Sequence, residues 1–116
     1  MTKEIYKSRA PLRISLAGGG TDIKNYFHKY GGAVLNIAIT KYAYSEITLK
    51  NEGFKAVAID ISKEFNFNKT QIDYANDGPL PLHLNTYFYM MEKYNNSELI
   101  HSEIQTYCDS PVGSGL

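Results

Sequence analysis

The sequence has one cysteine, no long apolar run and no excess of charge of either sign, and each absence excludes a class of protein. Cys108 can form no internal disulfide, which excludes disulfide-stapled secreted domains and fits a reducing cytosol. No stretch approaches the roughly 20 apolar residues of a membrane span, and the first residues lack the apolar run of a signal peptide. We therefore expect a cytoplasmic protein with no membrane partner.

The balance of charge limits what the protein can bind. The chain has twelve basic and twelve acidic residues, so it has no long-range positive field that would attract a polyanion. We expect no nucleic-acid partner, and any recognition of anions must be local. With 116 residues and 43% apolar residues, the chain is long enough for one compact domain with a packed core.

The histidines and the cysteine do not predict a metal site. His28, His83 and His101 lie far apart in the sequence and match no spacing of metal ligands. We interpret His28 and His101 as solvated residues, and Cys108 as a small buried hydrophobe rather than a nucleophile.

Alternation of apolar and polar residues from Ala10 to Leu16 predicts a half-buried strand. Gly18, Gly19 and Gly20 then allow a sharp turn. A short helix follows, with Thr21 or Asp22 as its N-cap and Gly31-Gly32 at its end. Its predicted buried stripe consists of Ile23, Tyr26, Phe27 and Tyr30.

The rest of the chain predicts a mixed α+β fold. An antiparallel meander is expected from three strands, at residues 34–39, 42–49 and 54–61. Residues 65–77 are expected to be irregular. A helix follows Pro79 and Pro81, with an apolar stripe of Leu84, Tyr87, Phe88, Met91 and Tyr94 that ends at Asn95-Asn96. The last predicted strand covers residues 99–107.

Two clusters of residues carry the chemistry that the sequence predicts. The first comprises Arg9, Arg13, Gly18, Gly19, Gly20, Thr21 and Asp22. A strand, a glycine turn and a helix start together form a patch of backbone donors beside guanidinium groups, which suits a phosphate or an oxygen-rich substrate.

The two arginines are assigned different roles, because four residues of straight strand separate their Cα atoms by about 13 Å. Arg13, nearer the turn, is the better site candidate, and Arg9 is either a substrate contact or a solvated charge at the strand end. Asp22 is either a helix cap or an acceptor for sugar hydroxyls.

The second cluster is Pro111, Val112, Gly113, Ser114 and Gly115, followed by Leu116. It is not a Walker A loop, but alternate glycines around a serine can present N–H groups to nucleotide phosphates. An ordinary turn explains the same residues.

The order and separation of the two clusters resemble the GHMP small-molecule kinases. Arg9 to Asp22 looks like their N-terminal substrate motif, and Pro111 to Leu116 looks like the first part of their phosphate loop. Within the superfamily, the three glycines before Thr21-Asp22 resemble the D-glycero-D-manno-heptose 7-phosphate kinases. Galactokinase-like members have Glu-His where this chain has Gly19-Gly20, which disfavours galactose.

The resemblance implies transfer of a phosphoryl group from ATP, with Mg²⁺, to the anomeric hydroxyl of a phosphorylated heptose, on the way to nucleotide-heptose and surface polysaccharide. It implies that Arg13 lies next to the transferred phosphoryl group, that Arg9, Gly19, Gly20, Thr21 and Asp22 contact the sugar, and that residues 111–115 surround the ATP phosphates. It further implies a fold like the second domain of ribosomal protein S5, with a mostly antiparallel sheet and helices on one side.

By the same resemblance, residues 1–116 correspond to an incomplete N-terminal domain, cut inside the phosphate loop. The metal-binding acid and the catalytic aspartate would then lie beyond Leu116, so we expect this chain alone to be inactive and its exposed edge to favour self-association. Two alternatives stay open: a kinase of another small molecule, such as a fucose-like sugar, and a non-enzymatic α+β binding module.

Overall fold

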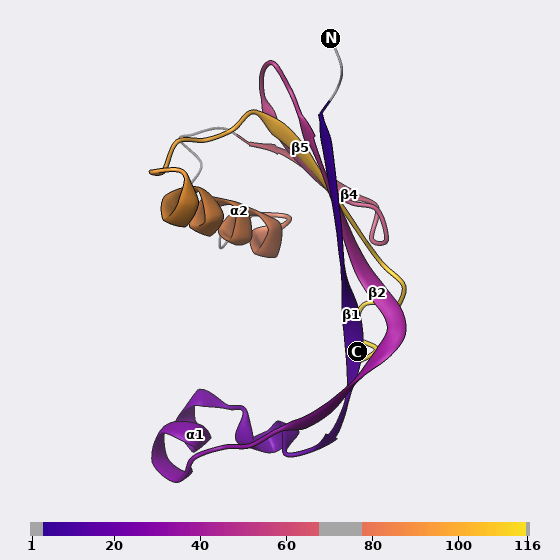
Figure 1. The fold of residues 1–116 in the computed structure, drawn as a ribbon, viewed down its shortest axis with the longest axis vertical. Coiled ribbons are helices and arrows are strands. Elements are labelled where there is room, and N and C mark those ends of the chain that lie inside the picture. The colour runs from indigo at the N-terminus through magenta and orange to yellow at the C-terminus, as the bar shows by residue number, and fades with distance from the viewer. Residues whose placement is uncertain (1–3, 68–77, 116) are drawn as a thin grey trace. The chain divides into compact units, whose positions relative to one another are not determined.

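The computed structural model describes residues 4–67 and 78–115. These residues form one five-stranded sheet and two α-helices (Figure 1), with the strands in the order β1-β2-β5-β3-β4. The elements are β1 (Ile5–Ala17), the 3-10 turn η1 (Gly19–Thr21), α1 (Lys24–Tyr30), β2 (Leu35–Leu49), β3 (Phe54–Ala58), β4 (Lys63–Phe67), α2 (Pro81–Tyr94) and β5 (Ser102–Cys108). The predicted α+β class is confirmed.

The chain divides into two compact units, which we describe separately. The α1 unit consists of Arg9–Ala43 and Cys108–Leu116, and the α2 unit consists of Met1–Ser8 and Tyr44–Tyr107. The long strands β1 and β2 each contribute residues to both units. None of the helices in the described part of the chain has the length and apolar character needed to cross a membrane.

The hydrophobic core lies in the α2 unit, where α2 packs on β3, β4 and β5. Strand β3 pairs with β4 in antiparallel and with β5 in parallel, so that Ala56 lies opposite both Phe65 and Ile104. Leu84 and Tyr87 of α2 are buried against these strands. The core members are Ala56, Ala58, Phe67, Leu80, Leu84, Tyr87 and Ile104. Leu84 and Tyr87 belong to the predicted stripe of α2, whereas Tyr94 at its end is 67% exposed.

The predicted meander is wrong. Residues 35–49 form one continuous strand, because no glycine or proline interrupts the β-forming residues around Thr40 and Lys41. Strand β5 then lies between β2 and β3. Residues 65–67, the start of the stretch that we predicted to be irregular, belong to strand β4, since Phe65 and Phe67 alternate toward the core. The remainder of that predicted stretch, residues 68–77, lies outside the described residues.

The α1 unit buries little apolar surface. We predicted that Ile23 and Tyr30 would face a core, but they are 61% and 65% exposed. Ile14 and Leu16, on the predicted buried face of β1, are also exposed. A seven-residue helix and two strand segments offer too little area to cover these side chains. The predicted strand and helix are confirmed, but their burial is not.

Candidate functional site

The glycine turn at the end of β1 depends on one glycine in particular. Gly18 has a φ of 83°, and a Cβ atom built there would lie 1.9 Å from the carbonyl oxygen of Ala33. Only glycine accepts both this backbone conformation and this close approach. Gly32 is a second close approach, because its Cβ would lie 2.6 Å from the carbonyl oxygen of Thr21. Gly19 and Gly20 have more room and form the start of η1.

Thr21 holds the turn against the chain that leaves α1. Its hydroxyl lies 2.7 Å from the Gly18 carbonyl oxygen and 3.0 Å from the Ala33 carbonyl oxygen, both acceptors, and it accepts the Ala33 N–H at 3.1 Å. The predicted capping role is wrong, because Ile23 occupies the N-cap of α1 and no side chain caps that helix. The intervening η1 turn places Thr21 and Asp22 too early in the chain to cap α1.

A hollow of about 290 Å³ opens beside this turn. Its walls are formed by Thr21, Asp22, Phe27, Gly32, Ala33 and Val34. The Asp22 carboxylate is exposed, and no described residue forms a hydrogen bond or ion pair with it. It is therefore available to accept hydrogen bonds from hydroxyl groups of a ligand in the hollow.

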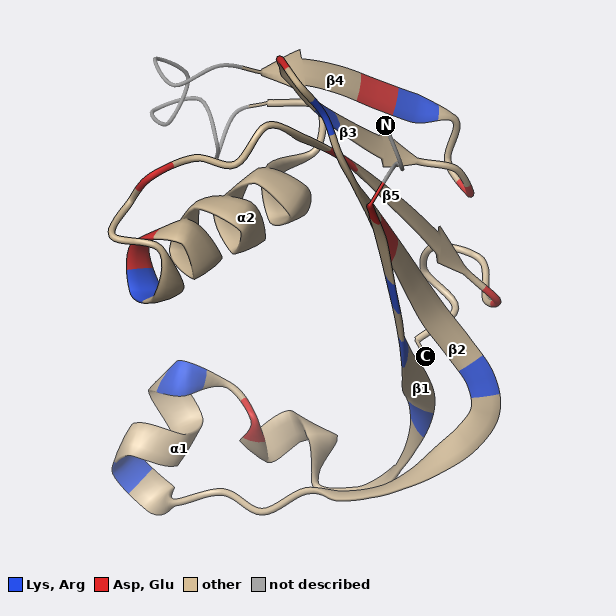
Figure 2. Cartoon of the chain, turned by 45° about the horizontal axis from the view of Figure 1, so that its top comes forward, with Lys and Arg blue, Asp and Glu red and all other residues tan. Residues whose placement is uncertain are grey.

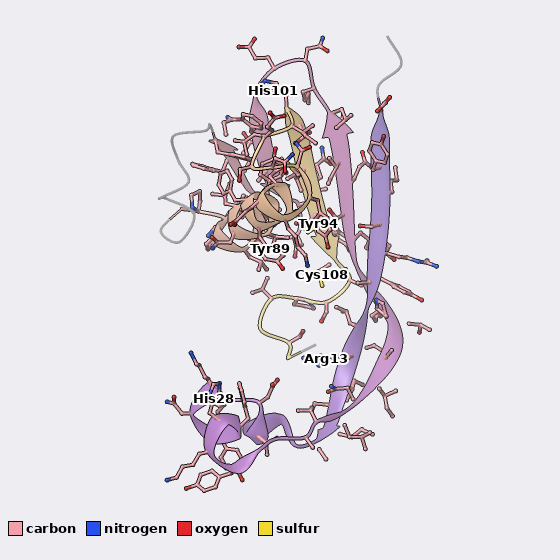
Figure 3. All side chains as sticks on the ribbon, turned by 60° about the vertical axis from the view of Figure 1, so that its left-hand side comes forward. Arg13, His28, Tyr89, Tyr94, His101 and Cys108 are labelled. Atoms are coloured by element: carbon pink, nitrogen blue, oxygen red, sulfur yellow. The ribbon has the colours of Figure 1, made fainter. Side chains whose placement is uncertain are left out.

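The two arginines of β1 differ in their surroundings. The Arg9 guanidinium lies over the ring of Tyr42, with its Cζ atom 4.6 Å from the ring centroid. No residue in the described ranges forms a hydrogen bond or ion pair with the Arg13 guanidinium. In all three views the segment that leads to the C-terminus lies beside the parts of β1 and β2 in the α1 unit, and Figure 3 shows Arg13 there.

The C-terminal glycine loop contains two glycines in the left-handed region of backbone conformation. Gly113 and Gly115 have φ values of 83° and 79°. The Ser114 N–H donates to the Pro111 carbonyl oxygen at 3.1 Å, and the hydroxyls of Ser110 and Ser114 are 2.6 Å apart. No described residue accepts a hydrogen bond from the N–H groups of Val112, Gly113 or Gly115. Unpaired N–H groups around such glycines fit the oxygens of a phosphate chain.

Both predicted clusters belong to the α1 unit, which also concentrates positive charge. It contains five lysines and arginines but only two acidic residues, Asp22 and Asp109 (Figure 2). The α1 unit therefore has a net positive charge, although the whole chain has none. A phosphorylated ligand would find a favourable field here.

A divalent cation does not fit the described residues as a set of ligands. No group of three or more His, Cys, Asp or Glu residues within residues 4–67 and 78–115 could hold a metal ion. Asp109 already accepts a backbone N–H through Oδ2.

No family model matches the chain. It is 33% identical to the D-glycero-alpha-D-manno-heptose 7-phosphate kinase of Campylobacter jejuni over 110 residues, which cover 95% of this chain and 32% of that protein. A D-glycero-D-manno-heptose 1-phosphate kinase from Bacteroides thetaiotaomicron superposes with a TM-score of 0.68 and 31% identity, over 97% of this chain and 36% of the other.

The chain therefore resembles the GHMP kinases, to which these relatives belong. Mevalonate kinase of Methanococcus jannaschii has the same fold, with a TM-score of 0.73 over 99% of this chain and 35% of the other, but at 18% identity it supports the fold alone. The chain thus spans about a third of the length of the relatives that it matches.

In this chain, sequence reasoning missed the contacts between distant segments. Gly32 was interpreted only as the end of α1, although Gly31 ends that helix and Gly32 admits the carbonyl of Thr21. Tyr42 and Asp109 belong to none of the motifs that the sequence analysis identified. A carboxylate directly between a strand and a glycine loop is the one signal that could have drawn attention to Asp109.

Proposed function

We propose that this chain provides the sugar-binding hollow and the ATP phosphate loop of a sugar-phosphate kinase. The proposed reaction transfers the γ-phosphoryl group of ATP to the anomeric hydroxyl of D-glycero-D-manno-heptose 7-phosphate, in nucleotide-heptose and surface-polysaccharide synthesis. The observation that carries the proposal is that a hollow with a carboxylate and a loop with unpaired N–H groups occur in one basic unit. The heptose-phosphate kinases among its relatives support the choice of sugar.

Each proposed role follows from the chemistry of the residue. Asp22 accepts hydrogen bonds from sugar hydroxyls, and Thr21 fixes the wall of the hollow through Ala33. Arg13, which has no partner among the described residues, balances negative charge on the phosphoryl group. Bound ATP supplies that group, and the N–H groups of Val112 and Gly113 hold its phosphate oxygens.

The sugar specificity that we propose rests on the absence of side chains at Gly19 and Gly20. Glycine at these positions has no group to read galactose hydroxyls, and no atom outside the adjoining residues lies within 4 Å of a Cβ built on Gly20. The extra carbons of a heptose could occupy this open side. A phosphate at the far end of the sugar would be attracted by the net positive charge of the unit.

We further propose that residues 1–116 act as the N-terminal segment of a longer kinase and have no activity alone. The relatives are about three times as long, since the chain covers 32% and 36% of them. The exposed apolar residues of α1 and β1 would also be covered by further chain in such an enzyme. In such an enzyme, the metal-binding acid and the catalytic aspartate that the family resemblance implies would lie in that remainder.

The test is a coupled assay of ADP release with the complete protein. Heptose 7-phosphate and heptose 1-phosphate are compared, because the relatives' names differ in the position of the phosphate, and galactose, fucose and mevalonate serve as controls. We expect turnover with heptose 7-phosphate only, and none with residues 1–116 alone. Turnover only with fucose would identify a different kinase, and absence of both turnover and ATP binding in calorimetry would favour a binding module.

A further inference from the structure

Asp109 joins the glycine loop to β2 through two hydrogen bonds to a single residue. Its carboxylate Oδ2 accepts the N–H of Tyr42 at 2.9 Å, and its own N–H donates to the carbonyl oxygen of Tyr42 at 2.9 Å. All of these atoms belong to the α1 unit. The residue just after β5 is thus fixed through both its side chain and its backbone, directly before the loop begins.

The same loop is closed on itself by contacts that begin at the next residue, Ser110. Ser110 is 8% exposed, and its hydroxyl lies 2.6 Å from that of Ser114. The Ser114 N–H donates to the Pro111 carbonyl oxygen. Asp109 thus fixes the start of the loop, and the contacts of Ser110 and Ser114 close its turn. The N–H groups of Val112 and Gly113 remain without an acceptor among the described residues.

Tyr42 connects this anchor to β1. Its backbone is held by Asp109, and its ring lies under the Arg9 guanidinium, at 4.6 Å from Cζ to the ring centroid. Arg9 therefore contacts a residue that holds the loop, which gives it a packing role distinct from that of Arg13. The contact links the two sequence clusters through one residue of β2.

We infer that Asp109 is a positioning residue for ATP: it acts through Tyr42 to hold the glycine loop in a shape that can bind phosphates. The inference rests on the function proposed above. A loop fixed before ATP arrives loses little conformational entropy on binding, and its donors need not reorganise during the reaction. Loss of the anchor should therefore weaken ATP binding and leave sugar binding nearly unchanged.

The test compares Asp109→Ala and Asp109→Asn in the complete protein. We expect Asp109→Ala to raise KM for ATP about tenfold, as the loss of one charge-assisted hydrogen bond predicts, with KM for the sugar phosphate unchanged. Asp109→Asn should regain most of the ATP affinity, because its amide oxygen can accept the same N–H. Asp60→Ala, which changes an exposed acid of the α2 unit, is the matched control.

A second measurement separates this inference from the proposed function and from misfolding. ATP binding to each variant is measured by calorimetry, and folding is checked by circular dichroism. If the unaltered protein binds no ATP, the proposed function fails; if it binds ATP and folded Asp109→Ala binds equally well, only the inference fails. If Asp109→Ala does not fold, the comparison of Asp109→Asn with the unaltered protein decides: unchanged ATP affinity supports the role of the acceptor, and a tenfold loss contradicts it.

Discussion

The Thr21 hydroxyl accepts a hydrogen bond from the N–H of Ala33, twelve residues later in the chain. The same hydroxyl lies within hydrogen-bond distance of the Ala33 carbonyl oxygen, so the side chain closes the loop that contains α1. Both residues form walls of the hollow beside the glycine turn. The shape of the candidate sugar site therefore depends on a hydroxyl whose position in the sequence suggests only a helix cap.

Thr21→Val should open this loop, because valine has the shape of threonine but cannot bond to Ala33. We expect a loss of about 1 kcal/mol in the free energy of unfolding, measured in urea by circular dichroism. In the complete protein, KM for the sugar phosphate should rise while KM for ATP stays the same. Thr21→Ser keeps the hydroxyl and serves as the control; a loss in Thr21→Ser as large as that in Thr21→Val would show that the methyl group matters as much as the bond, and no loss in Thr21→Val would contradict the role of the hydroxyl.

Gly18→Ala and Gly20→Ala should differ strongly in stability. A methyl group at Gly18 would overlap the Ala33 carbonyl oxygen and force an alanine to adopt a φ of 83°. We expect a loss of about 3 kcal/mol or more in the free energy of unfolding. At Gly20 no atom outside the adjoining residues lies within 4 Å of the added Cβ, so stability should change by less than about 1 kcal/mol. Comparable urea midpoints for the two variants would contradict the observed turn geometry.

Arg13→Ala should reduce kcat/KM of the complete protein far more than Arg9→Ala does. Arg13 has no partner among the described residues, so its charge is available to a phosphoryl group, and its removal should reduce kcat/KM about a hundredfold. Arg9 instead contacts the Tyr42 ring, and its removal should lower stability by about 1 kcal/mol. Equal kinetic losses in the two variants would refute this division of roles, and Arg13→Lys shows how much depends on the guanidinium shape.

Local patterns in the sequence predict most of the elements but not their partners. The alternation after Arg9, the glycine run and the stripe on α2 each specify a strand, a turn or a helix, and all three form. The order of the strands in the sheet could not be predicted in this way. Strand β5 lies between β2 and β3, and alternation within one strand does not specify which strand pairs with it. The sequence also predicted two strands where β2 is one. A polar interruption of two residues, Thr40 and Lys41, was interpreted as a break, but it does not end the strand.

The candidate site was predictable where chemistry and motif coincide in the sequence. Arg13 and Asp22 lie on either side of three glycines that predict a turn, and the charged groups of both side chains have no partner among the described residues. The contacts that fix the site are long-range: Thr21 with Ala33, and Asp109 with Tyr42, which is 67 residues away. The partner in each contact is a backbone N–H group, which every residue type except proline has. The identity of Ala33 or Tyr42 in the sequence therefore cannot predict the bond.

The stability of the α2 unit should decrease below neutral pH because of His83. Its Nε2 atom lies 2.7 Å from the Thr106 hydroxyl, and burial lowers the pKa of the ring below its ordinary value of 6.5, an effect that the charge of Asp60 partly opposes. As the pH falls past about 6.5, the His83 ring takes up a proton in the unfolded chain more readily than in the folded chain. The free energy of unfolding is therefore unaffected by protonation of His83 above that pH and decreases as the pH falls from about 7 to 5. His83→Gln can still bond to Thr106 but does not titrate, and urea unfolding at pH 7 and pH 5 should show a smaller loss for this variant than for the unaltered chain. His28→Gln, at an exposed position on α1, should lose as much stability as the unaltered chain; the same pH dependence in all three proteins would mean that the folded state accepts the proton on His83 without penalty.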